Sequence, residues 1–113
     1  MVKIIKNFLD QQDFINLKEF CLGNCNWFYR RHMTWNDDPF FNHCFYNLHR
    51  VQSDHYDLVL PLIKKLDVKA VIQIRANIVL AKEKPYKSDL HTDVNDLNST
   101  TAIYYLTTCN GYT

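Results

Sequence analysis

The clearest pattern in the sequence is an apolar residue at every second position between Val68 and Leu80. The even-numbered positions are all apolar: Val68, Ala70, Ile72, Ile74, Ala76, Ile78 and Leu80. The odd-numbered positions include the polar residues Lys69, Gln73, Arg75 and Asn77. A period of two predicts a strand with its apolar face against helices. Its polar face is either solvated or lines a pocket.

Two further elements are predicted near the N-terminus. Val2–Phe8 has the short apolar pattern of a strand. Asp10 or Asp13 can then cap a helix whose apolar residues recur at helical spacing, namely Phe14, Leu17 and Cys21.

Two aromatic-rich segments follow, Trp27–Trp35 and Phe40–Val51, and they flank the turn-like sequence Asn36-Asp37-Asp38-Pro39. They predict two strands of a hairpin or meander.

A second helix is predicted after the capping residues Ser53 and Asp54, and it runs to about Leu66. Its apolar face consists of Tyr56, Val59, Leu60, Ile63 and Leu66. Pro61 lies inside this pattern, and an internal proline costs about 3 kcal/mol in a regular helix. The sequence therefore predicts a kink or a break there.

The C-terminal part predicts a polar loop over Lys82–Asn98 and a strand over Thr100–Thr107. Asn110-Gly111 is a strong hairpin signal, and the sequence stops two residues after it. A hairpin turn without a returning strand predicts that the sequence is cut off there.

Composition limits the class of protein. The 113 residues are 47% hydrophobic and 22% charged, which fits one folded domain rather than a disordered chain. The net charge of +1 gives no reason to expect nucleic acid or an anionic membrane as a partner. No apolar run is long enough to span a bilayer. The segment Met1–Leu9 lacks the long apolar stretch and the small-residue cleavage site of a secretory signal, so we expect a cytoplasmic protein.

The four cysteines, Cys21, Cys25, Cys44 and Cys109, allow two disulfides or a zinc site with His43 or His49. No C-x-x-C pair is present, and no second pair has zinc-finger spacing. We therefore expect free thiols, buried as small apolar groups.

One metal-binding pattern stands out, the triplet His91-Thr92-Asp93. In extended backbone the first and third residues project to the same side, so an imidazole and a carboxylate can meet one metal. With a distant histidine they would form the facial triad of non-haem Fe(II) oxygenases. A second triplet, His55-Tyr56-Asp57, lies in a predicted helix, where these positions point about 200° apart.

Other polar and aromatic residues have simpler interpretations. His32, His43 and His49 lie among aromatic residues and are expected to be packed or exposed rather than ligands. Tyr104 and Tyr105 are by default core aromatics of a strand.

The segment from Ile74 to Thr113 nevertheless resembles the 2-oxoglutarate- and Fe(II)-dependent dioxygenases. The resemblance is to the prolyl-4-hydroxylase-like group, including versions common in marine phages. It depends on three features in order: the R-x-N strand at Arg75 and Asn77, the H-x-D triplet, and T-x-I-Y-Y-L followed by N-G-Y-T. The resemblance covers the last forty residues, whereas the first seventy fit it loosely.

The resemblance implies site residues. His91 and Asp93 would be two iron ligands, Tyr105 would bind the distal carboxylate of 2-oxoglutarate, and Asn77 would touch this cosubstrate. Relatives often have a tyrosine two residues after that asparagine, where this chain has Val79. The family also has a second histidine ligand and a 2-oxoglutarate-binding arginine or lysine further along, which this sequence does not contain. The implied cofactors are Fe(II) and 2-oxoglutarate, with ascorbate allowed.

The resulting prediction is an α+β fold, with helices on one side of a mainly antiparallel sheet that belongs to a partial double-stranded β-helix (jelly-roll, cupin-like). Residues 1–67 would support the first core strands in 68–113. The predicted function is a dioxygenase (hydroxylase) acting on a protein side chain or small molecule, or an inactive fragment of one. The alternatives are a non-catalytic cupin-like binding module with a relic metal site and a Cys/His zinc module. An open barrel edge would allow a homo-oligomer.

Overall fold

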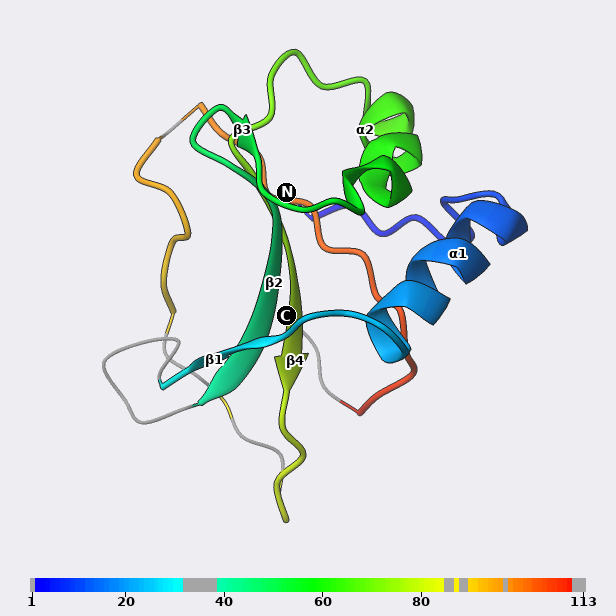
Figure 1. Cartoon of the computed structure of the whole chain (residues 1–113). Helices are drawn as coiled ribbons and strands as arrows, with labels where there is room; N and C mark the ends of the chain where they lie inside the picture. Colours follow the sequence, from blue (N-terminus) through cyan, green and yellow to red (C-terminus); the bar gives the residue numbers. More distant parts are fainter. Residues whose placement is uncertain (1, 32–38, 85–86, 88–89, 97, 111–113) are drawn as a thin grey trace.

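A computed structural model gives positions for residues 2–31, 39–84, 87, 90–96 and 98–110, and only these residues are described below. Their helices and strands are, in chain order, α1 (Gln11–Leu22), β1 (Phe28–Arg30), β2 (Phe40–Asn47), β3 (Arg50–Val51), the 3₁₀ helix η1 (Tyr56–Val59), α2 (Leu60–Leu66) and β4 (Gln73–Val79). The predicted α+β class is confirmed, because helices pack beside one sheet (Figure 1).

The sheet is built around β2. Strand β4 pairs with β2 along its full length, from Phe40 opposite Val79 to Asn47 opposite Gln73. A bulge after Cys44 shifts the register of this pairing. Strands β1 and β3 pair with the two ends of the other edge of β2, and every pairing is antiparallel. The predicted antiparallel hairpin between the two aromatic segments is therefore confirmed for β1 and β2.

The two faces of the sheet have different environments. The helices and the C-terminal segment lie on one side, whereas the chain around residues 90–96 lies on the other side (Figure 1). The core is on the helix side and combines Leu17, Phe20 and Cys21 of α1 with Phe45 of β2 and Val59 of η1. Ile74 and Ala76, two of the even-numbered residues of β4, pack against this core. The predicted orientation of the apolar face is thus confirmed within β4.

Helix α1 begins directly after Asp10, one of its two predicted caps, and it contains Phe14, Leu17 and Cys21 as predicted. Asp10 occupies the N-cap position, although its side chain makes no capping hydrogen bond. Instead, its carboxylate lies 3.4 Å from the Lys65 ammonium of α2, which also donates to the Phe8 carbonyl oxygen at 2.8 Å. At the other end, a Cβ on Gly23 would lie 2.8 Å from the Glu19 carbonyl oxygen. This close approach explains why a glycine follows the helix.

The predicted second helix is divided in two, as Pro61 led us to expect. Residues 56–59 form η1, and α2 starts at Leu60 with the proline in its first turn. A proline is tolerated there because the first turn needs no backbone N–H donor. Ser53 lies just upstream, where its hydroxyl oxygen accepts the His55 N–H at 3.1 Å.

Three predicted strands differ from the structure. Val2–Phe8 forms no strand: Val2 is 88% exposed, and Asn7 has a φ of 52°, outside the extended region. The segment 100–107 also forms no strand in the described chain, because Tyr104 and Leu106 pack against the core without entering the sheet. The strand predicted from Val68 begins only at Gln73. In each case the apolar pattern was present, but the segment pairs with no strand among the residues that the structure describes.

A fourth difference is the break in the strand predicted over Phe40–Val51. Leu48 and His49 have φ values of 49° and 66° and form a two-residue turn between paired Asn47 and Arg50. Such a turn prefers asparagine and glycine, and each larger residue costs about 1–2 kcal/mol there. The sequence therefore contains no recognisable signal for this turn.

The core position of Phe45 yields a stability prediction. This side chain is 1% exposed, so Phe45→Ala is expected to lower the free energy of unfolding by about 3–5 kcal/mol, measured by urea denaturation. Phe28 is the matched control, because it lies in the same sheet but is 61% exposed. Phe28→Ala should cost less than about 1 kcal/mol. Similar losses in the two variants would contradict this placement of the core.

Candidate functional site

The face of the sheet opposite the helices is polar over most of its length, with Phe40 and Val79 paired at one end. Its residues on β2 and β4 alternate with those of the core face and include Asn42, Asn47, Gln73, Arg75 and Asn77. Two contacts between side chains cross this face. The Gln73 amide donates to Asn47 Oδ1 at 3.4 Å, and Arg30 Nε donates to Asn42 Oδ1 at 3.4 Å. The polar face predicted from the period-two pattern therefore carries hydrogen bonds between its own side chains, whereas Asn77 on the same face is exposed.

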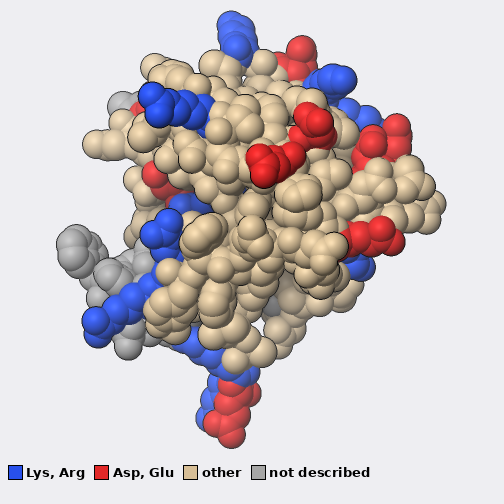
Figure 2. All heavy atoms as spheres, viewed as in Figure 1, with Lys and Arg blue, Asp and Glu red and all other residues tan. Residues whose placement is uncertain are grey.

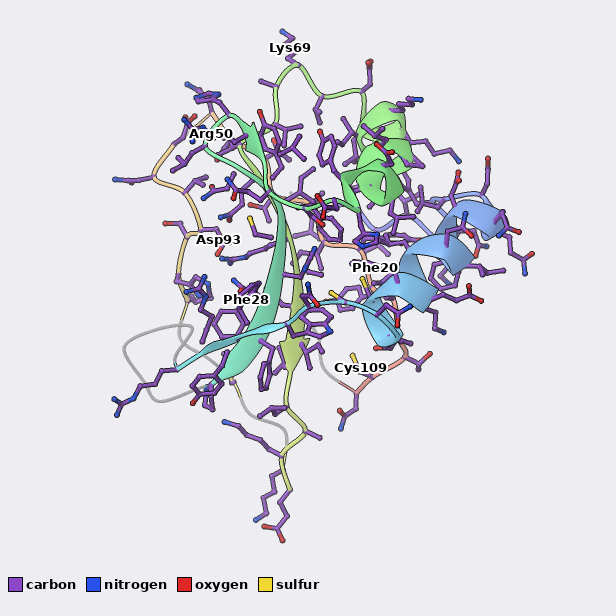
Figure 3. All side chains as sticks on the ribbon, viewed as in Figure 1. Phe20, Phe28, Arg50, Lys69, Asp93 and Cys109 are labelled. Carbon is purple, nitrogen blue, oxygen red and sulfur yellow. The ribbon has the colours of Figure 1, made fainter. Side chains whose placement is uncertain are left out.

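The H-x-D triplet lies against this polar face. Arg75 of β4 donates from Nη2 to Asp93 Oδ1 at 2.9 Å, and His91 Nε2 lies 3.4 Å from the same oxygen. The Arg75 and Asp93 side chains are 26% and 35% exposed, so water only partly screens their ion pair. Figure 3 shows Asp93 on the opposite side of the sheet from Phe20 of α1. The structure thus brings together Arg75, His91 and Asp93.

The spacing of His91 and Asp93 fits one metal ion. Two ligand atoms bound at right angles and about 2.1 Å from a metal lie about 3 Å apart, close to the 3.4 Å observed here. An imidazole nitrogen with a carboxylate oxygen is also a donor set that suits Fe(II). Within the part of the chain that the structure describes, no third histidine, cysteine, aspartate or glutamate completes a group of three. The pair can hold a cation but supplies only two ligands.

The other two predicted site residues lie in different places. Asn77 is on the polar face, two positions along β4 from Arg75 and opposite Asn42 of β2. Tyr105 is 52% exposed and belongs to the segment after residue 100, which runs on the helix side of the sheet (Figure 1). Its neighbour Tyr104 contacts Phe14 of α1, with ring centroids 6.2 Å apart. Burial raises the pKa of Tyr104 above its ordinary value.

The second triplet differs from the first, as its helical position predicted. His55 immediately precedes η1, and its ring packs against Phe20 with centroids 4.2 Å apart. Asp57 lies in η1 and is exposed. This triplet therefore offers a matched control for His91 and Asp93.

His43 has a structural role that its sequence context only partly predicted. Its Nδ1 lies 2.8 Å from the Asn26 carbonyl oxygen, which can only accept, so Nδ1 carries the proton. Its Nε2 then accepts the Ser53 hydroxyl at 2.8 Å. Both side chains are buried, at 7% and 8% exposure. Of the two environments expected for these histidines, packed or exposed, His43 has the first and His49 the second, and His32 lies outside the described residues.

All four cysteines are free, as predicted, although only Cys21 is buried and Cys109 is exposed. Burial, together with the negative charge of a Cys25 thiolate, raises the pKa of Cys21 to about 11. Burial also raises the pKa of Cys25 to about 11. Both groups are therefore protonated thiols near neutral pH, a form in which sulfur is a poor nucleophile and metal ligand.

A shallow cavity of about 480 Å³ lies next to the triplet. It is lined by the β2–β3 turn, the segment before β4 and the residues that follow Asp93, namely Tyr46, Leu48, His49, Ala70, Val71, Ile72, Val94, Asn95 and Asp96. The lining is mostly apolar with a polar rim. Charges of both signs are dispersed over the face of the molecule seen in Figure 2.

Comparison of the chain with protein-family models, with curated proteins and with solved structures found no match. Function is therefore inferred from the geometry of the chain's own residues. Neither α1, α2 nor any other helix in the described ranges has the length and apolar character of a membrane span.

The His43 network yields a second stability prediction. Ser53→Ala removes the donor to His43 Nε2 and the acceptor of the His55 N–H. Leaving a buried polar group unpaired should lower the free energy of unfolding by about 1–3 kcal/mol, measured by thermal denaturation. Asp54→Ala, at the exposed position next to Ser53, should change it by less than about 0.5 kcal/mol. A Ser53→Ala variant as stable as the wild type would contradict the assigned hydrogen bonds.

Proposed function

We propose that this chain is, or is part of, a 2-oxoglutarate- and Fe(II)-dependent dioxygenase in which His91 and Asp93 hold the iron. The observation that carries the proposal is the 3.4 Å distance between His91 Nε2 and Asp93 Oδ1, on the polar face of an antiparallel sheet. The order of Arg75, Asn77, His91 and Asp93 along the chain supports it, because these residues form the pattern that resembles the family.

The fold is compatible with this proposal at a coarse level. Double-stranded β-helix enzymes carry their metal on the inner, polar side of antiparallel strands, with helices outside. Here the helices cover the apolar face, and the triplet lies on the other side (Figure 1). We therefore propose that β2 and β4 belong to such a barrel.

When bound, Fe(II) with 2-oxoglutarate supplies the oxidising chemistry, in which decarboxylation of the cosubstrate is coupled to hydroxylation of an unreactive C–H bond. The protein's own residues bind and orient. His91 offers an imidazole nitrogen, and Asp93 offers a carboxylate oxygen 3.4 Å from it. Arg75 orients that carboxylate through its ion pair, and Asn77 adds an amide on the same face.

A second candidate is a non-catalytic cupin-like module in which the triplet is a relic. The observation in its favour is the ion pair with Arg75, which satisfies Asp93 without any metal. The two candidates differ in whether the pair binds a cation.

Metal binding decides between the two candidates. We expect the wild-type chain, titrated anaerobically with Fe(II) and 2-oxoglutarate, to develop a visible charge-transfer absorption. Asp93→Asn should weaken Fe(II) binding by at least about tenfold, because the amide oxygen carries no charge for the cation. Asp57→Asn is the matched control, since it makes the same change in the second triplet and should bind as the wild type does.

Far-UV circular dichroism of both variants shows whether each keeps its fold. Absence of the absorption band in folded wild-type protein would contradict the oxygenase proposal for this chain and favour the relic module. If Asp93→Asn and Asp57→Asn bind Fe(II) with the same affinity, the iron binds somewhere other than His91 and Asp93.

A further inference from the structure

The candidate metal pair has an unusual neighbour, because a fixed cation already contacts its carboxylate. Asp93 Oδ1 lies 2.9 Å from Arg75 Nη2 and 3.4 Å from His91 Nε2. The same oxygen therefore faces both the guanidinium and the imidazole. A second guanidinium, that of Arg30, donates to Asn42 on the same polar face. The positive charge in contact with the metal pair is thus that of Arg75.

This arrangement has an electrostatic consequence for a divalent cation. A cation held by His91 Nε2 and Asp93 Oδ1 would share its carboxylate with Arg75, and like charges at such short range repel. Arg75 is only 26% exposed, so solvent screens this repulsion less than it would at an open surface. A guanidinium also cannot lose its proton to relieve it. Arg75 should therefore weaken the binding of a metal ion that arrives alone.

The charge balance changes when an anion binds with the metal. A divalent cation, the Asp93 carboxylate and the Arg75 guanidinium together leave two positive charges, and an imidazole that binds a metal adds none. A small dicarboxylate carries two negative charges and cancels them. Without Arg75, the same ligands would leave one uncompensated negative charge.

We propose that Arg75 makes metal binding at His91 and Asp93 depend on an anionic co-ligand of the small-dicarboxylate class. The inference rests on the proposed function, since it assumes that this pair holds a cation. It assigns Arg75 a role beyond orienting Asp93: the residue couples the two binding events. A positioning role alone predicts a different result, because loss of Arg75 would then weaken metal binding whether or not a dicarboxylate is present.

The test is a calorimetric titration of the full chain with Mn²⁺, performed without and with saturating 2-oxoglutarate. In the wild type, 2-oxoglutarate should tighten Mn²⁺ binding within the range of about 5- to 150-fold that is usual for coupled sites. In Arg75→Gln, Mn²⁺ alone should bind more tightly than in the wild type, and the gain from 2-oxoglutarate should fall by about tenfold. Arg75→Lys keeps the charge and should retain most of that gain.

Two results would overturn the inference, and they can be told apart. An unchanged gain from 2-oxoglutarate in Arg75→Gln, with equal or weaker binding of Mn²⁺ alone, would leave Arg75 as a positioning residue and would leave the proposed function standing. Absence of Mn²⁺ binding in the wild type, or binding that persists undiminished in His91→Ala, would overturn the proposed function and this inference with it.

Discussion

The pairing of β4 with β2 is the interaction on which the rest of the structure depends. It aligns seven residues of β4 with the length of the central strand, so that the alternation along β4 becomes two separate faces. Ile74 and Ala76 join the core formed by α1, η1 and Phe45, whereas Arg75 and Asn77 face away from it. A shift of one residue in this register would exchange the two faces and expose the core.

The position of the candidate site follows from this separation. Arg75 projects from a strand that is held by its pairing with β2, so its guanidinium is well placed to hold Asp93, which lies in a segment without regular structure. The chain then crosses to the helix side, where Tyr104 and Leu106 contribute to the core (Figure 1). The polar face of the sheet is consequently joined to the segment around Asp93 by the ion pair between Arg75 and Asp93.

Features encoded by local patterns could be predicted from the sequence. Helix α1, the alternation of β4 and the break at Pro61 each depend on residues within a few positions of one another. The segments 2–8 and 100–107 could not be predicted, because strand formation depends on a neighbouring strand that the local sequence does not specify.

The candidate site shows the same limit. The H-x-D triplet was visible in the sequence, and its expected placement outside a helix distinguished it from the triplet at His55. The ion pair between Arg75 and Asp93 joins residues 18 positions apart, and the hydrogen bond between His43 and Ser53 joins residues 10 positions apart. Such contacts follow from the sheet register and the loop path, which no local pattern encodes.

The central claim is that the polar face of the sheet carries a cation site centred on Asp93. Nuclear magnetic resonance of the ¹⁵N-labelled chain with substoichiometric Mn²⁺ tests it directly, since the paramagnetic ion broadens the signals of nearby amides. Amides of Asp93, Arg75 and Asn77 should broaden first, whereas those of Leu17 and Phe20 on the helix side should stay sharp. Broadening that begins on the helix side, or spreads uniformly over the chain, would contradict the claim.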